Sequence, residues 1–463
     1  MPTGRRAAPI GVGALGLSGV KCHSARRFPG GGLASRAAWR AVRSSRFCWV
    51  TRRTIEFSCA VTVIGLLAGV AGAATTVFLD FIEHLTYHYS FGSMLDGVSG
   101  SSRIRQAVGP MIGGALAGWG WWLLRRRMSV PTVDEAISRP GPLPRGAMTL
   151  DAALQTLLVG SGASLGRENA PRLFAVALGD LGTSRWALTA RDREILLGCA
   201  AGAGLGAVYG VPIGGALFAL RIVLHTWNIR AVLTALATSG LAVLVAAPFT
   251  HDEPALQWPH PHLSYQLIAV AVLLAPLALG VGLAFRRLMD AARSRSAARG
   301  PRNTWLLIPT LAAAGLLVGV CSHRLPELPG NGSSVLLVSV DRGLSVAAAG
   351  AIMILKPLLT AAFLRAGAVG GLLTPALATG AALGAVVALS VSAWTPLHLN
   401  VPAVSLACAA GVLAVTQGSP DWAAIFVWEL ARPPWWLLLV FSAAAFSANL
   451  LQRKVAPPAE SVH

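Results

Sequence analysis

One short stretch of this sequence places a carboxylate among glycines inside a long apolar region. Residues 162–171 read Gly-Ala-Ser-Leu-Gly-Arg-Glu-Asn-Ala-Pro, with the carboxylate at Glu168. Glycine permits tight turns and close backbone approach, and proline is favoured in the first turn of a helix. The pattern therefore predicts a helix that begins near Glu168 or Asn169 and directs its free amide groups into the interior of the protein.

A helix start of this kind binds anions without a full positive charge, because its unpaired N–H groups carry the positive end of the helix dipole. The sequence Gly-Gly-Leu-Leu-Thr-Pro at residues 370–375 repeats the arrangement. Two helix starts that converge would hold a desolvated anion weakly enough to release it, as conduction requires.

Two roles are open to the Glu168 carboxylate. It either occupies the anion site as a tethered anion, which protonation or a competing free anion displaces, or it caps the helix start and only stabilises it. An ionisable group at membrane depth indicates a functional site. We therefore expect Glu168 to gate an anion path.

The composition indicates that these elements lie in a membrane. The chain of 463 residues is 54% hydrophobic and only 12% charged, whereas soluble domains carry about 25% charged residues. Residues 366–420 contain no Lys, Arg, Asp or Glu, and a spanning helix needs roughly 20 apolar residues. The sequence thus predicts an all-α, multi-pass membrane protein rather than a large soluble enzyme.

Positive charge is concentrated at a few places along the chain. The net charge is +19, and residues 1–55 hold eleven Arg or Lys and no acid. Further basic clusters occur at 125–127 and 286–302. The positive-inside rule assigns all three to the cytoplasmic side, so we expect both termini in the cytoplasm and the protein in the cell membrane. Nucleic-acid binding is not expected, because no folded basic domain accompanies the tail.

Several apolar segments are too short to span a bilayer. Glycine and proline residues interrupt the apolar sequence and limit these segments to about 150–165, 171–187, 403–417 and 422–430. Non-helical backbone at membrane depth survives only where it is buried in protein or lines a cavity. Short helices at matching places in two halves indicate a binding site near the midplane.

The two halves do match. Cys-Ala-Ala-Gly begins at Cys199 and again at Cys408, and each copy leads to a proline, Pro212 or Pro420. Linked matches at similar spacing favour a duplication, and with it an inverted-repeat bundle of full and broken transmembrane helices. We expect a basic, disordered N-terminal segment at 1–50, membrane repeats at 51–285 and 304–452, a basic cytoplasmic linker at 286–303 and a C-terminal tail at 453–463.

These motifs together resemble a known family. GASLGRENAP resembles the G-x-S-x-G-[RK]-E-G-P motif of the CLC family of chloride channels and proton/chloride antiporters, and the segment from Ile354 to about Gly384 resembles its second motif, G-x-F-x-P. VPIGGALFAL and GSPDWAAIFVWEL resemble its paired interface regions. The resemblance runs from about Thr54 to Leu451. It implies a homodimer in the bilayer with one anion path per subunit, of bacterial type, without the C-terminal regulatory domains of many eukaryotic members.

The resemblance implies roles for particular residues. Glu168 matches the gating glutamate, and Gly166 and Arg167 match the residues before it. Asn169 stands where the family has glycine, and the helix proline is delayed by one position. We expect the amide donors of this segment to persist and to bind the anion.

The central anion site is altered. Leu372 and Leu373 match the residues whose backbone N–H groups coordinate the anion, with Leu373 in place of the usual phenylalanine. The first family motif is degraded: its alignment puts Met128 at the anion-binding serine, and Ser129 substitutes only with a shift of one residue. The coordinating tyrosine near the C-terminus is missing.

The proton path is altered as well. Ile222 stands where antiporters have the glutamate that receives protons from the cytoplasm, and an apolar side chain cannot relay protons. The sequence therefore predicts chloride conduction gated by Glu168 with weak or no proton coupling. A proton/chloride antiporter with another internal route and a fluoride exporter stay open, as some fluoride-transporting members lack the serine too.

Functions of other classes have less support. A membrane-embedded enzyme would need paired acids, a Ser/His pair or a metal motif, and the sequence shows none of these, so no enzyme activity and no cofactor are expected. A degenerate, non-conducting family member is a further alternative. Six cysteines without CxxC spacing predict neither a disulfide framework nor a metal site. A loop at 250–263 with three histidines and two acids is read as solvated.

Four other charges within apolar sequence have open roles. Lys356 and Arg365 either raise the positive potential near the path or extend to the membrane interface. Arg221 and Glu429 occupy equivalent positions in the two halves, which suggests an ion pair between them.

Overall fold

The computed structural model describes residues 33–90, 92–186, 188–250, 258, 265–297, 305–339 and 344–455. Within these ranges the chain is helical, and no β-strand is formed beyond one isolated bridge. The chain divides into two units, Met1–Thr54 and Ile55–His463. The second unit holds all of the sites described below.

The helices of the first half are α1 (Leu33–Tyr87), α2 (Met94–Gly100), α3 (Arg103–Arg127), α4 (Val133–Ser138), α5 (Arg145–Gly160), α6 (Asn169–Thr183), α7 (Ala190–Tyr209), α8 (Pro212–Phe218), the π-helical turn η1 (Ala219–Val223) and α9 (Ile229–Ala246). Those that follow are α10 (Tyr265–Leu273), α11 (Ala275–Ala297), α12 (Leu307–Ser322), α13 (Ser333–Leu337), α14 (Val346–Ala366), α15 (Leu373–Trp394), α16 (Val401–Gln417), α17 (Pro420–Ala431) and α18 (Leu437–Val455).

These bounds differ from the sequence-based expectations at two places. Residues 33–50, which were expected to be disordered, belong to α1, where alanine and arginine are good helix formers. The basic segment that was expected to be a linker is helical up to Ala297, as the last part of α11. The four apolar segments that were expected to be short correspond to α5, α6, α16 and α17.

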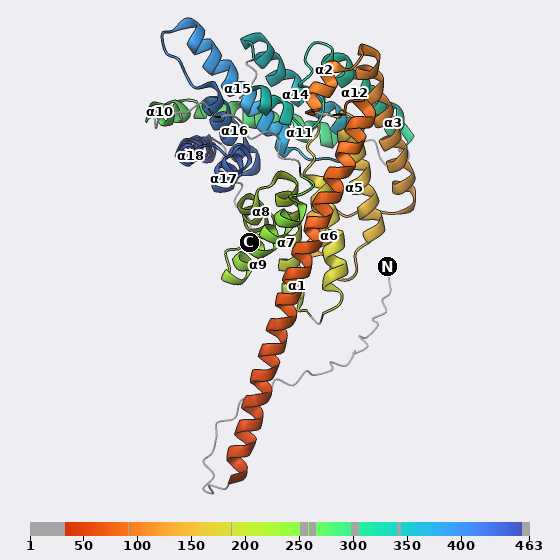
Figure 1. Cartoon of the computed structure of the whole chain (residues 1–463), viewed down its shortest axis with the longest axis vertical. Helices are drawn as coiled ribbons and strands as arrows, with labels where there is room; N and C mark the ends of the chain where they lie inside the picture. The colour runs from red at the N-terminus through yellow and green to blue at the C-terminus, as the bar shows by residue number, and fades with distance from the viewer. Residues whose placement is uncertain are drawn as a thin grey trace, which may run out of the picture. The chain divides into compact units, whose positions relative to one another are not determined.

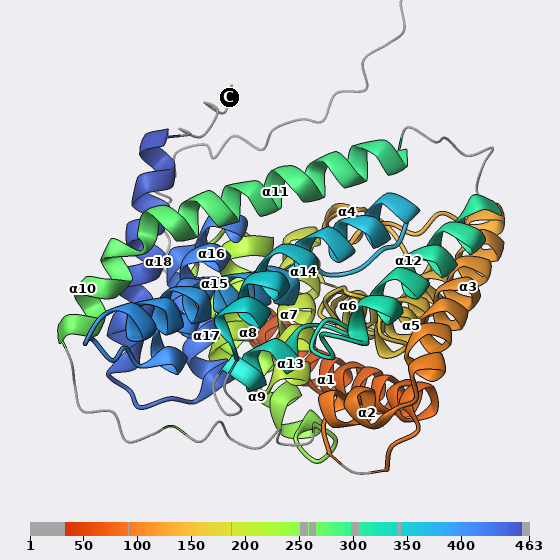
Figure 2. The same ribbon diagram turned by 90° about the horizontal axis from the view of Figure 1, so that it is seen from above.

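Two helices form the centre of the bundle. Every residue of α7 from Ile195 to Val208 is buried, and so is every residue of α16 from Ala403 to Val415. A helix that is apolar all round belongs in an interior. In the first half α7 packs against α6, α8 and α9 (Figure 1). In the second half α16 packs against α15, α17 and α18 (Figure 2).

The repeat seen in the sequence reappears in backbone geometry. Helices α7 and α16 both end in a left-handed glycine, Gly210 with φ 64° and Gly418 with φ 69°. Glycine adopts this conformation without steric strain. Each glycine is followed by a helix with proline in its first turn, Pro212 in α8 and Pro420 in α17. The chain reverses direction in the same way in both halves.

Length and composition support a multi-pass membrane protein. Four described helices are long and apolar enough to cross a bilayer: Thr54–Tyr87, Ile229–Ala246, Val346–Ala366 and Leu373–Trp394. The pair α10 and α11, bent by 45°, provides a fifth if it is counted as one span. Three further apolar helices among the described residues are shorter than a span: Pro212–Val223, Leu307–Ser322 and Val401–Gln417.

Candidate anion-binding site

The two glycine-rich breaks lie against each other in the folded chain. The Gly166 amide donates to the Gly371 carbonyl at 2.8 Å, and the Gly371 amide donates to the Gly166 carbonyl at 3.1 Å. This antiparallel bridge joins the start of α6 to the start of α15. Segments separated by more than two hundred residues thereby build one site.

The Glu168 carboxylate lies at the start of α15, not at the start of its own helix. Glu168 is the residue before α6, yet its side chain makes no capping hydrogen bond there. Instead Oε1 accepts from the Leu373 amide at 2.6 Å, and Oε2 accepts from the Thr374 hydroxyl at 3.2 Å. The side chain is 1% exposed. The first half of the chain therefore supplies an anion to a helix start of the second half.

Space for this carboxylate exists only because two neighbours are glycine. A Cβ atom added at Gly371 would lie 2.0 Å from Oε1 of Glu168, and one added at Gly166 would lie 2.2 Å from Oε2. Contacts this short are not tolerated between heavy atoms. Glycine at both positions is a requirement for Glu168 to occupy the site.

Tyr209, the last residue of α7, also contacts the carboxylate. Its hydroxyl donates to Oε2 of Glu168 at 3.3 Å. The Arg167 guanidinium carbon lies 5.0 Å from the centre of the Tyr209 ring, and Phe426 packs edge-on against that ring at 5.8 Å. Our sequence analysis missed Tyr209 and Thr374. The signal for Tyr209 was a lone polar aromatic residue directly before the break between α7 and α8.

Asn169 is held by a buried polar network. Its side-chain amide donates to Gln155 at 2.9 Å, and the Gln155 amide donates to Asp151 at 2.7 Å. The Trp121 indole donates to the same carboxylate at 2.7 Å. The network ties the first turn of α6 to α5 and α3 and leaves the side chain of Asn169 occupied.

A cavity of about 320 Å³ adjoins Glu168. It is lined by residues from α6, α8, α11, the end of α16 and the segment Gly370–Leu373. Its charged members are Glu168, Arg172, Arg286, Asp290 and Arg293. Arginine outnumbers acid around this space, so the cavity favours an anion.

Met128 and Ser129 do not join this cavity. Met128 directly follows α3 as its C-cap, with 46% of its surface exposed, and Ser129 is exposed beside it. Neither residue lines the cavity next to Glu168.

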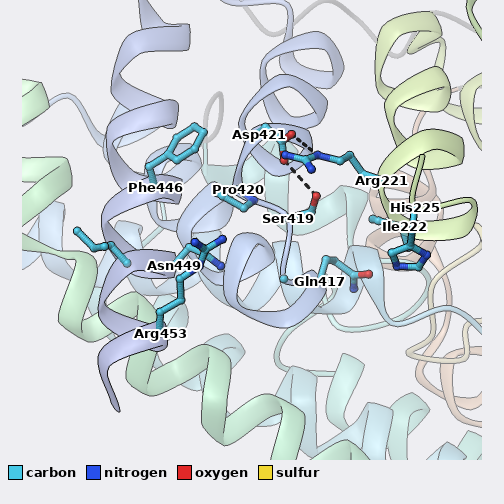
Figure 3. A pocket seen from close by; sticks show the side chains of 12 residues that line it. Arg221, Ile222, His225, Gln417, Ser419, Pro420, Asp421, Phe446, Asn449 and Arg453 are labelled. Carbon is cyan, nitrogen blue, oxygen red and sulfur yellow. Dashed lines mark hydrogen bonds and ion pairs between the residues drawn. The ribbon is translucent and has the colours of Figure 1, made fainter. Parts of the chain in front are cut away.

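Ile222 lines a second cavity, of about 580 Å³ (Figure 3). Arg221 and Asp421 form an ion pair at its edge, and the Ser419 hydroxyl donates to Asp421 at 3.1 Å. His225 lines the same space. Ile222, although apolar, therefore shares its cavity with titratable side chains.

The expected ion pair between Arg221 and Glu429 is not formed. Arg221 pairs with Asp421. Glu429 accepts hydrogen bonds from the amides of Ile213 at 3.0 Å and Gly214 at 2.6 Å, so it caps the start of α8. Equivalent positions of two repeats need not meet, and here each residue finds its partner at the other half's helix start.

Lys356 is fully buried, which rules out the alternative that it extends to the membrane interface. Its ammonium group donates to the carbonyls of Leu328 at 2.8 Å and Gly330 at 2.7 Å. Arg365, near the end of the same helix, is exposed.

The histidine-rich loop at 250–263 lies outside the described residues, apart from Thr250 and Trp258. Among the described residues, no group of three His, Cys, Asp or Glu side chains could hold a metal ion.

Comparison with known proteins adds independent information. Residues 113–453 match the family model described as voltage gated chloride channel. The voltage-gated ClC-type chloride channel ClcB of Salmonella typhimurium is 28% identical over 379 residues, which cover 80% of this chain and 89% of that protein. The protein of the same name from Escherichia coli O17:K52:H18 is 26% identical over 377 residues, with the same coverage.

Solved structures with a similar fold are transporters. A slow cyanobacterial Cl⁻/H⁺ antiporter matches with a TM-score of 0.75 at 17% identity, covering 87% of this chain and 95% of that chain. A CLC-type fluoride/proton antiporter matches with a TM-score of 0.68 at 18% identity, covering 88% and 97%. At such identities the likeness concerns the fold alone.

Proposed function

This chain belongs to the voltage-gated chloride channel family, and from that premise we propose that it moves chloride and similar small anions across the cell membrane past a gate formed by Glu168. The observation that carries the proposal is the hydrogen bond from the Leu373 amide to the Glu168 carboxylate. A carboxylate held by a helix start stands in for a free anion at that position.

Gating follows from competition for these donors. While Glu168 is ionised and in place, the donors of Leu373 and Thr374 are occupied. Protonation of the carboxylate, or a free anion that takes its donors, releases the side chain and opens the path. Gly166, Arg167, Asn169 and Leu372 shape the two helix starts.

We further propose that proton coupling is weak or absent, because Ile222 offers no proton-accepting atom. The antiporter alternative is favoured by one observation: His225 and Asp421 line the same cavity as Ile222. A proton route through those side chains would couple anion flux to proton movement, so the choice between the two requires a flux measurement. Fluoride export is the other candidate activity.

The assembly and orientation belong to the same proposal. We propose a homodimer with both termini in the cytoplasm. The basic residues of 286–297 at the end of α11 support a cytoplasmic location for that end.

The test is anion efflux from proteoliposomes loaded with chloride, nitrate or fluoride, with a proton-sensitive dye inside. We expect chloride efflux without proton uptake, and loss of its pH dependence in Glu168→Ala. Uphill proton movement driven by a chloride gradient would overturn the uncoupled proposal. If Asp421→Asn then abolished the proton movement but not the chloride flux, the antiporter alternative would hold.

A non-conducting protein would show no efflux of any of the three anions, although it reconstitutes normally. Efflux of fluoride alone would identify a fluoride exporter.

A further inference from the structure

The first turn of α6 is tied to a neighbouring helix by one side chain. Glu168, the residue before the helix, makes no capping hydrogen bond there, and its carboxylate binds the start of α15 instead. Asn169 is the first residue of α6, and its side-chain amide donates to Gln155 on α5 at 2.9 Å. This bond fixes the turn that carries Glu168.

Glu168 lies between two fixed points of the chain. Before it, Gly166 forms the backbone bridge to Gly371. After it, Asn169 is held through its side chain by Gln155. The family motif has glycine in place of Asn169 and could not make the second of these contacts. A functional side chain keeps its geometry when the residues around it are locked by hydrogen bonds, so both points restrict where the carboxylate reaches.

The neighbours of Gln155 fix the direction of its hydrogen bonds. The Trp121 indole can only donate, and it donates to Oδ1 of Asp151 at 2.7 Å. The Gln155 amide nitrogen donates to Oδ2 of the same carboxylate at 2.7 Å. An ionised carboxylate only accepts, so Asp151 turns the carbonyl oxygen of Gln155 toward Asn169.

Burial makes this orientation stringent. The side chains of Trp121, Asp151 and Gln155 are all buried. Asp151 and Gln155 are four residues apart on α5 and therefore share one face of the helix. Hydrogen bonds to a charged acceptor are stronger than neutral ones, and a buried polar group that loses its partner is costly. Arg125 on α3 supplies an attractive positive charge to Asp151.

We propose that Gln155 is a positioning residue of the gate and that Asp151 orients it. Gln155 holds Asn169 and with it the first turn of α6. The fixed turn keeps the ionised Glu168 carboxylate at the Leu373 amide. When the link is broken, the turn gains freedom and the carboxylate leaves the start of α15 more often. This inference deepens the proposed gating by Glu168 and rests on it for its effect on anion flux.

The first test is hydrogen–deuterium exchange of the Leu373 amide in the purified full-length protein in detergent. Glu168 protects that amide, so its exchange rate measures how often the carboxylate leaves. Gln155→Met keeps the length of the side chain but removes the amide that holds Asn169. We expect Leu373 exchange to rise by about threefold or more, equivalent to one hydrogen bond of ordinary strength. An unchanged rate would overturn the proposal.

Asn169→Ala breaks the same hydrogen bond from the other side, and it decides the matter if Gln155→Met does not fold. The expected rise in Leu373 exchange is the same, because the first turn of α6 again loses its link to α5. Exchange at the wild-type rate would count against the proposal in the same way.

A double variant tests the direction of the hydrogen bonds. Asp151→Asn with Gln155→Glu exchanges the positions of the carboxylate and the amide and keeps the net charge. The amide oxygen at position 151 then accepts from Trp121, and the amide nitrogen there donates to the carboxylate at position 155. That carboxylate accepts from Asn169. Leu373 exchange should therefore equal that of the wild type, and a rate as high as in Gln155→Met would contradict the assigned direction.

Gln155→Glu alone tests the role of Asp151. It turns two buried carboxylates toward each other, which is unfavourable when both are ionised. In alkaline buffer, where no proton bridges the two groups, Leu373 exchange should exceed that of the double variant. Equal rates in the single and double variants would show that Asp151 does not orient the residue at position 155.

Asp180→Asn is the matched control for general destabilisation. Asp180 is another buried carboxylate, near the other end of α6, and it pairs with Arg145 and Arg193. Its substitution should lower the thermal unfolding midpoint in detergent without changing Leu373 exchange. A rise in exchange as large as in Gln155→Met would reveal a general loosening of α6 and would overturn the proposal.

Chloride efflux provides a second readout. Because the link stabilises the closed gate with Glu168 ionised, its loss lets the gate open at a lower proton concentration. Gln155→Met should therefore move the pH of half-maximal efflux upward by about half a unit, which corresponds to the threefold change in exchange.

The inference and the proposed function fail separately in this design. If Gln155→Met raises Leu373 exchange but wild-type proteoliposomes show no efflux, the inference stands and the proposed function fails. If Glu168 gates the efflux while Leu373 exchange in Gln155→Met equals that of the wild type, the inference fails and the proposed function stands.

Discussion

At the scale of single residues, the site is defined by what surrounds one carboxylate. Glu168 receives hydrogen bonds from a backbone amide and two hydroxyl groups, and two glycines leave it space. The donors come from Leu373, Thr374 and Tyr209, and they would equally suit a halide. In the proposed mechanism, the closed state is a balance in which the tethered carboxylate and free anions compete for the same donors.

Tyr209→Phe should shift that balance toward the open state. The substitution removes the hydroxyl that donates to Glu168 but keeps the ring that packs against Arg167 and Phe426. A hydrogen bond to a charged group contributes about 1.5–3 kcal/mol, so chloride efflux at fixed pH should rise. In a Glu168→Ala background the same substitution should have little effect, and a full effect there would show that Tyr209 acts independently of the gate.

Gly371→Ala should expel Glu168 from the start of α15. The added methyl group would lie 2.0 Å from Oε1, and the carboxylate must move. Efflux of the folded variant should lose its pH dependence as Glu168→Ala does. Gly240→Ala is the control, since nothing lies within 4 Å of its added methyl group. A pH dependence like that of the wild type in Gly371→Ala would refute the tethered-anion mechanism.

At the scale of elements, helix starts organise the molecule. Helices α7 and α16 each end in a left-handed glycine and lead into a short helix that begins with proline. Helix α8 cannot cap its own first turn, because Val211 at its N-cap offers no side-chain acceptor. Glu429 of α17 accepts from two of its amides instead. Contacts between the halves thus replace local capping.

Glu429→Ala should destabilise this junction. The substitution removes the acceptor of the Ile213 and Gly214 amides, and the loss of a helix N-cap costs about 0.5–2 kcal/mol. The thermal unfolding midpoint in detergent should fall. Glu194→Ala, which removes an exposed ion pair with Arg191, should change the midpoint much less, because such pairs contribute about 0–1 kcal/mol. Equal falls in both variants would contradict the capping role.

At the scale of the whole molecule, each half of the chain is incomplete without the other. The break before α6 pairs with the break before α15, and the α8 start is capped from α17. The candidate anion site and the α8 junction are therefore each built from both halves of the chain. The proposed association of two copies would involve exposed surfaces such as that of α8.

The proposed dimer predicts a sensitive position on α8. Ile213 lies in the segment that resembles the family's interface, and 44% of its surface is exposed. Ile213→Trp should convert dimers to monomers in a mass measurement in detergent, because the larger ring prevents close packing. Leu277→Trp on α11, with 48% exposure at the starting residue, should leave the mass unchanged. A dimer that withstands Ile213→Trp would assign the interface to another surface.

The sequence by itself determined that this is a helical membrane protein, because composition and the spacing of residues are properties of short segments of the chain. Apolar runs of spanning length predict membrane helices, and glycine followed by proline predicts where helices break and begin. The resemblance of the motifs at 162–171 and 370–375 predicted the family, which the match over residues 113–453 confirms. The role of Glu168 as a gate stays a prediction.

Only the tertiary structure decided which residues meet, because side-chain partners come from distant segments. The partner of Arg221 is Asp421 rather than Glu429, and Lys356 bonds to carbonyls of a loop before α13. Tyr209 and Thr374 converge on Glu168 from different helices. Spacing along the chain does not encode such distances. The packing of α6 against α7 and the bridge between Gly166 and Gly371 set them.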